Sequence, residues 1–133
     1  MEKWEEFENK IPKSKYYSTK ICNSDEEGLV VTLYDCKNVI DIMFGRVISV
    51  NTIEEGMNQD YLYSDEITNV LKKVNFDNVI YKVFDGVYCD FVKKIANGMW
   101  EAVNAEHYVI ITQNFNIDII SEFEPEIVIQ SLE

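Results

Sequence analysis

An alternation of apolar and polar residues between Leu29 and Ile53 constrains the fold of this 133-residue chain more than any other feature. Apolar side chains recur at every second position on either side of a polar break, Asp35–Asn38. A period of two is typical of pleated strands. A second break, Gly45–Arg46, offers a glycine that can take the positive φ of a primed hairpin turn. The stretch therefore predicts three antiparallel strands joined as a meander.

Three other segments have the spacing of amphipathic helices. Trp4, Phe7 and Ile11 are spaced for a short helix that ends before Pro12. A serine N-cap, acids in the first turn and apolar residues at helical spacing predict a helix over Asp65–Val74. The same apolar period, ended by a glycine, predicts another helix over Val87–Asn97.

The remaining segments predict further strands and one loop. The lysine-bearing stretch Lys13–Asn23 is predicted to be a loop, and Val79–Phe84 alternates like a strand. Two β-branched runs, His107–Thr112 and Asn116–Ser121, predict a hairpin, and Ile127–Ile129 predicts an edge strand. Residues 1–133 are therefore predicted to form a single α+β domain. Its one mostly antiparallel sheet, the meander plus the C-terminal hairpin, would be covered by two or three helices.

The charge of the chain is strongly acidic and unevenly spread. Twenty-four Asp and Glu against 12 Lys and Arg give a formal net charge of −12. Neither Lys nor Arg occurs from Val47 to Leu71 or from Ile95 to Glu133. A surface of this sign repels phosphate, which argues against nucleic-acid binding and favours a basic protein partner. The alternative is that the acidity only keeps a small protein soluble.

Several features indicate a cytoplasmic protein that does not contact membranes. No apolar run approaches the ~18 residues of a membrane-spanning helix. The N-terminal segment lacks the basic start and apolar core of a signal peptide. The three cysteines, Cys22, Cys36 and Cys89, are widely spaced without a CxxC pair, which is typical of free thiols in a reducing compartment.

Motifs for catalysis, metals and cofactors are missing from the sequence. The five glycines stand singly, so they form neither a dinucleotide fingerprint nor a phosphate-binding loop. His107 is the only histidine, and the acids Asp25–Glu27 lack the alternating spacing of a calcium loop. A cysteine thiol activated by His107 is the catalytic alternative to a structural histidine. We predict no enzyme activity, no metal and no cofactor.

The segments DIMFGRVISV, QDYLYSDEI and HYVIITQNFNIDIISEFEP resemble, in their layout, the small immunity proteins that accompany polymorphic secreted toxins of Gram-positive bacteria. The resemblance implies a cytoplasmic antitoxin that binds and blocks a cognate toxin domain, often a nuclease with a basic active-site surface. It implies no catalytic residue, because such proteins act by occlusion. The other function class is a structural or adaptor domain, such as one of phage origin, that binds another protein or a small ligand.

The predicted partner-binding surface lies in the first window without Lys or Arg, where acids and tyrosines are interleaved. Acids there would enter a cationic groove and speed association, while aromatic side chains would slow release. The alternative is a solvated acidic face at the start of a helix. The candidate binding residues are Glu54, Glu55, Asp60, Tyr61, Tyr63, Asp65 and Glu66.

Overall fold

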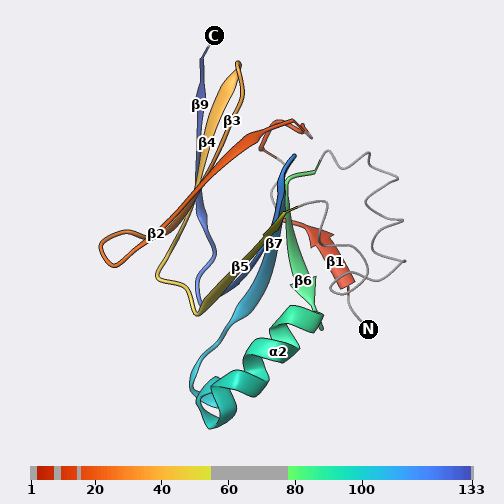
Figure 1. Cartoon of the computed structure of the whole chain (residues 1–133), viewed down its shortest axis with the longest axis vertical. Coiled ribbons are helices and arrows are strands. Elements are labelled where there is room, and N and C mark those ends of the chain that lie inside the picture. Colours follow the sequence, from red (N-terminus) through yellow and green to blue (C-terminus); the bar gives the residue numbers. More distant parts are fainter. Residues whose placement is uncertain (1–2, 8–9, 15, 55–77, 133) are drawn as a thin grey trace.

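The computed structural model describes residues 3–7, 10–14, 16–54 and 78–132, which form two antiparallel sheets and one α-helix (Figure 1). The five-stranded sheet has, in spatial order, β1 (Lys3–Glu6), β6 (Ile80–Phe84), β7 (Glu106–Ile111), β8 (Phe115–Ser121) and β5 (Ser49–Glu54). The four-stranded sheet has β2 (Ser18–Ser24), β3 (Gly28–Tyr34), β4 (Asn38–Gly45) and β9 (Glu126–Ser131). The helix α2 (Val87–Ala96) continues into the 3₁₀ helix η2 (Asn97–Ala102).

The main core lies between the two sheets. Alternate residues of each strand point to one face, so the apolar set of β3 and β4, such as Leu33 and Ile40, faces inward. It packs in one cluster with residues of the other sheet, including Tyr108, Ile110 and Ile117. The two sheets therefore stabilise each other by burying the same apolar surface.

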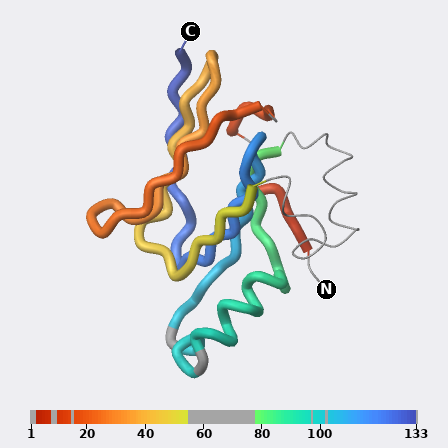
Figure 2. The backbone as a smooth tube through the Cα atoms, in the orientation of Figure 1, coloured from red at the N-terminus to blue at the C-terminus, as the bar shows by residue number. Residues whose placement is uncertain are grey.

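The outer face of the five-stranded sheet is covered in part by α2. Tyr88 and Val92 are the buried residues of this helix, and they pack against Ile120 of β8. Figure 2 shows the helix running along the lower part of this sheet. Within the described residues, no helix has the length and apolar character needed to span a bilayer.

Two of the chain's crossings between the sheets, β4 to β5 and β8 to β9, run side by side. β4 pairs with β9 in one sheet while β5 pairs with β8 in the other. The last paired positions on the two sides are Met43 with Glu126 and Ser49 with Ile120, so residues 44–48 lie opposite residues 121–125. The amide of Ile48 donates to the carbonyl of Ile120 at 2.8 Å. The crossings thus form one antiparallel ribbon that bends from one sheet into the other.

This arrangement shows that the prediction of a single sheet covered by two or three helices was wrong. The third predicted strand exists as β5, but it pairs with β8 instead of β4, so the segment is not a three-stranded meander. Gly45 has the expected positive φ of 73°, but it lies at a β-bulge before the crossing and not in a hairpin turn. The fold is mostly β, and α2 is the only α-helix in the described part of the chain.

Two predictions near the N-terminus were also wrong. The predicted helix at Trp4 is strand β1, where an offset of three residues sends Trp4 and Phe7 to opposite faces of the sheet. The ring of Trp4 lies 5.3 Å from that of Tyr81, and the ring of Phe7 lies 5.2 Å from that of Tyr108. The predicted loop Lys13–Asn23 contains β2, an edge strand that needs few apolar residues because it pairs on one side.

The other predicted elements have been confirmed where the structure describes them. Strand β6, helix α2, the hairpin of β7 and β8, and the edge strand β9 lie within a few residues of the predicted ranges. The acidic segment before β3, Asp25–Glu27, is an exposed turn. The predicted helix Asp65–Val74 lies outside the described residues.

Three buried tyrosines should make the protein unstable at high pH. Burial, with a smaller effect from nearby carboxylates, raises the pKa of Tyr17, Tyr81 and Tyr108 to about 12. In the unfolded chain a phenol ionises at about 10, so between these values the unfolded state holds fewer protons than the folded state. We expect the free energy of unfolding, measured with urea at a series of pH values, to fall steadily from about pH 10 upward.

Tyr17→Phe provides the test of this alkaline effect. Its hydroxyl donates to the carbonyl of Pro12 at 2.6 Å, so the variant should lose some stability at neutral pH. Above pH 10 its stability should fall less steeply than that of the wild type, since one raised pKa has been removed. Equal slopes for both proteins would contradict the assignment.

Candidate functional site

One member of the predicted binding patch lies within the described residues. Glu54 is the last residue of β5 and is exposed at an edge of the five-stranded sheet. The other six, Glu55, Asp60, Tyr61, Tyr63, Asp65 and Glu66, lie outside the described residues. The patch as a whole therefore stays a prediction.

A second acidic surface lies at one end of the four-stranded sheet, and we call it the acidic end. The pairing of Leu29 with Gly45 and of Met43 with Glu126 brings the β2–β3 turn to the same end of the sheet as the β8–β9 connector. Neighbouring strands lie about 4.8 Å apart, so these two segments lie within about 15 Å of each other. In Figure 2 the β2–β3 turn (orange) and the β4–β5 crossing (yellow) lie on the same side of the molecule. The acidic end comprises Asp25, Glu26, Glu27, Glu122, Phe123, Glu124 and Glu126, which are all exposed.

Phe123 is the aromatic residue of the acidic end, and its side chain is 66% exposed. Its backbone is held by Ser121, whose side chain is fully buried. The Ser121 hydroxyl donates to the Phe123 carbonyl at 2.9 Å and accepts from the Phe123 amide at 3.2 Å. An apolar ring is thus presented to solvent on a backbone that the core holds in place.

The potential of the acidic end is negative, because only one of its six carboxylates is paired with a cation among the described residues. Arg46 lies on the β4–β5 crossing, and its guanidinium is 3.9 Å from Asp25. Both of these side chains are highly exposed, so the pair contributes little and is screened by salt. Ile48, on the same crossing, adds a partly exposed apolar side chain beside the connector.

A second polar site lies on the outer face of the five-stranded sheet and is buried. His107 Nε2 and Asp118 Oδ1 are 2.8 Å apart, and the two side chains are 4% and 2% exposed. Tyr88 of α2 lies over the pair, with its ring 5.9 Å from the imidazole, and it shares a hydrogen bond with the hydroxyl of Ser49. Within the described part of the chain, His107 Nδ1 and Asp118 Oδ2 have no hydrogen-bond partner.

A histidine and a carboxylate in contact could act as a general base if a substrate could reach the imidazole. Here the way to Nδ1 is closed by the backbone before α2, since a Cβ added at Gly86 would lie 2.4 Å from that nitrogen. We therefore assign the pair a structural role, in which it fastens β7 to β8 beneath the helix. This agrees with the structural role predicted for His107.

Cys89 does not have the surroundings of an activated nucleophile. Burial raises the pKa of the Cys89 thiol, and the neighbouring carboxylate of Asp90 raises it further. A thiol in such surroundings stays protonated and reacts slowly. Cys22 and Cys36 are exposed free thiols.

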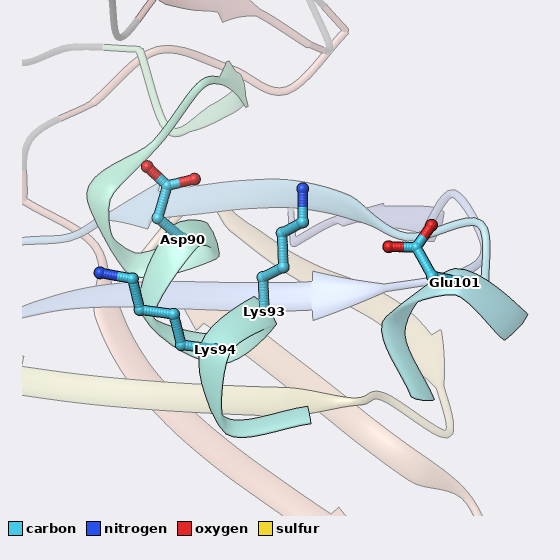
Figure 3. A pocket seen from close by; sticks show the side chains of 4 residues that line it. All are labelled: Asp90, Lys93, Lys94 and Glu101. Carbon is cyan, nitrogen blue, oxygen red and sulfur yellow. The ribbon is translucent and has the colours of Figure 1, made fainter. Parts of the chain in front are cut away.

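An open hollow on α2 is lined by four charged side chains (Figure 3). They are Asp90, Lys93 and Lys94 of α2 and Glu101 of η2. Their charges cancel, and the hollow is open to solvent, unlike the clefts that enclose most of a small molecule. Among the described residues, no group of three or more metal-ligating side chains comes together.

Comparisons with protein-family models, with curated proteins and with solved structures gave no match to this chain. Its function must therefore be inferred from its own surfaces.

Sequence reasoning missed both Phe123 and Asp118. Phe123 stands between glutamates in a connector, where an isolated aromatic residue is a signal of surface exposure. Asp118 interrupts a run of isoleucines in a strand whose residues are all buried except the first. A charge in such a run requires a buried polar partner. His107, in the neighbouring predicted strand, was the candidate partner.

Proposed function

We propose that this chain is a non-catalytic acidic domain that binds a basic protein, and specifically that it is an immunity protein that binds and blocks a cognate toxin. The observation that carries the proposal is the exposed ring of Phe123, held rigidly among the carboxylates of the acidic end. The layout resemblance to immunity proteins points to the same class of function.

The two kinds of residue at the acidic end would have different tasks. Carboxylates steer a basic partner and raise its association rate, and their effect weakens with salt. An aromatic anchor that enters a pocket slows dissociation, and burying a side chain of this size contributes roughly 1.5–3 kcal/mol. A nuclease toxin fits this surface by charge, because its phosphate-binding groove is basic.

Support also comes from the two groups whose chemistry could serve catalysis, the His107 imidazole and the Cys89 thiol. The His107–Asp118 pair is sealed beneath α2, and the pKa of Cys89 is raised. These properties favour structural roles for both.

The product of the neighbouring gene is the first partner to test. We expect Phe123→Ala to weaken binding to the toxin by roughly tenfold to a hundredfold, mainly through faster dissociation. Glu122→Lys combined with Glu124→Lys should instead lower the association rate by about tenfold at low salt, and by less at high salt. Biolayer interferometry over a series of salt concentrations measures the association and dissociation rates. Growth of cells that express the toxin with each variant reports protection.

The matched control for charge is Glu101→Lys, which makes the same kind of change on η2, away from the acidic end. It should leave both rates nearly unchanged. A double variant in the sequence-predicted patch, Glu55→Lys with Asp60→Lys, decides whether that surface takes part. If none of the substitutions at Phe123 or in the two acidic surfaces changes toxin binding, the proposed binding sites are wrong. If the wild type fails to protect cells, the proposed immunity function is wrong.

A further inference from the structure

The helix α2 exposes an apolar stripe on its solvent side. Val87, Phe91 and Ile95 are spaced four residues apart and so share one face, and they are 50%, 57% and 66% exposed. Met99, in the following turn of η2, is 71% exposed. The helix already buries a different face, with Tyr88 and Val92, against the sheet. Four exposed large apolar residues on α2 and the turn that follows it are an unusual surface for a monomer.

The flank of this stripe carries one charge of each sign. Asp90 and Lys94 are one turn apart on the side of α2 that Figure 3 shows. Within the described part of the chain, neither of them forms an ion pair with the other or with a further residue. Both charges are available to a partner.

We propose that the α2 stripe binds a second copy of this chain, with the two helices packed antiparallel across a two-fold axis. The spacing is self-complementary about a centre beside Lys93. In this register Phe91 faces Ile95 of the second copy. Each contact occurs twice, as an isologous interface requires.

The flanking charges fit the same arrangement. In an antiparallel pair of helices related by a two-fold axis, each flank meets the same flank of the partner. Asp90 then lies within about 3 Å, along the helix axis, of the level of Lys94 of the second copy, a distance that a lysine side chain spans easily. Two opposite-charge pairs form, one on each side of the two-fold axis.

Electrostatics favours this face over others for self-association. Two copies of a chain with a net charge of −12 repel each other across most surfaces. The segment Val87–Ala102 carries Asp90, Lys93, Lys94 and Glu101, and its net charge is zero. Two copies can therefore approach here without the repulsion that the acidic end would produce.

The size of the stripe sets the strength of the dimer. Its four side chains expose about 490 Å² per copy, taking about 200 Å² for each fully exposed side chain. Over the two copies the buried total is therefore about 1,000 Å², the range of weak and transient complexes. We expect a dissociation constant on the order of 10–100 µM. The dimer is independent of the proposed function, because the acidic end lies on other elements.

Sedimentation equilibrium of the full chain between about 10 µM and 1 mM tests the dimer. The wild type should dimerise as its concentration rises, and Phe91→Ser should weaken the dimer at least about tenfold. Phe123→Ser is the matched control. It makes the same change at a similarly exposed ring outside the stripe and should leave the dimer intact. Ile95→Ser is the second stripe variant, and the near-ultraviolet circular dichroism of each variant checks that it is folded.

A charge exchange tests the register. Asp90→Lys or Lys94→Asp alone should weaken the dimer about fivefold, since each single change places like charges opposite each other twice. The double variant Asp90→Lys with Lys94→Asp should restore it. A wild type that remains monomeric up to about 1 mM overturns the proposal. So does a dimer that survives Phe91→Ser and Ile95→Ser, which would place the contact elsewhere, for example at the open edge of β9. Failure of the double exchange to restore the affinity overturns the antiparallel register.

Discussion

Gly28→Ala is expected to lower the free energy of unfolding by about 4 kcal/mol, because two separate costs fall on this position. Gly28 has a φ of +73°, which places the Cβ of an L-residue in an unfavourable position. That Cβ would also lie 2.0 Å from the carbonyl carbon of Gly45. The obstacle is backbone, which cannot rotate away as a side chain would. Urea-induced unfolding measures the loss.

Gly45→Ala separates the two costs. Gly45 has the same φ of +73°, but nothing lies within 4 Å of a Cβ added there. Gly45→Ala should therefore lower the free energy of unfolding only by the conformational cost, about 1 kcal/mol. Equal losses at the two glycines would show that the close approach of β3 to the end of β4 does not limit the side chain at position 28.

Asp118→Val is expected to lower the free energy of unfolding by about 3 kcal/mol. Valine has nearly the shape of aspartate, so the change removes an acceptor without opening a large cavity. His107 Nε2 then loses its partner in a site that water does not reach. Thermal unfolding should show a matching fall of about 10 °C in the midpoint temperature.

Asp118→Asn is the matched control for this pair. Its side-chain carbonyl can still accept from His107, so it should lose about 1 kcal/mol or less. A double-mutant cycle with His107→Leu measures the coupling, and the double variant should recover part of the loss of Asp118→Val. Equal stability of the valine and asparagine variants would contradict the role assigned to the hydrogen bond.

The sequence by itself determined the type of most elements that the structure describes. β3, β4, β7 and β8 were predicted correctly because their alternation and β-branched residues are local signals. The helix α2 was predicted for the same reason, since its period appears within ten residues. The acidity that motivates the proposed function is likewise a property of composition.

Only the tertiary structure decided which strand pairs with which. β5 has the pattern of a strand, but nothing within Ser49–Glu54 specifies β8 as its neighbour instead of β4. β1 and β2 also depend on tertiary structure. Their sequences do not predict strands, and each is held as a strand by its neighbour: β1 by β6, and β2 by β3. A hydrogen-bonded ladder can join any two extended backbones, so the choice depends on how both sheets bury their apolar faces together.

The exposed surfaces likewise depend partly on the sequence and partly on the tertiary structure. Sequence spacing alone aligns Val87, Phe91 and Ile95, but their exposure follows from which face of α2 meets the sheet. The acidic end joins residues that are about a hundred positions apart, and it exists because β9 returns beside β4. His107 and Asp118 meet for the same physical reason: long-range pairing, which no local pattern encodes, sets the register of β7 against β8.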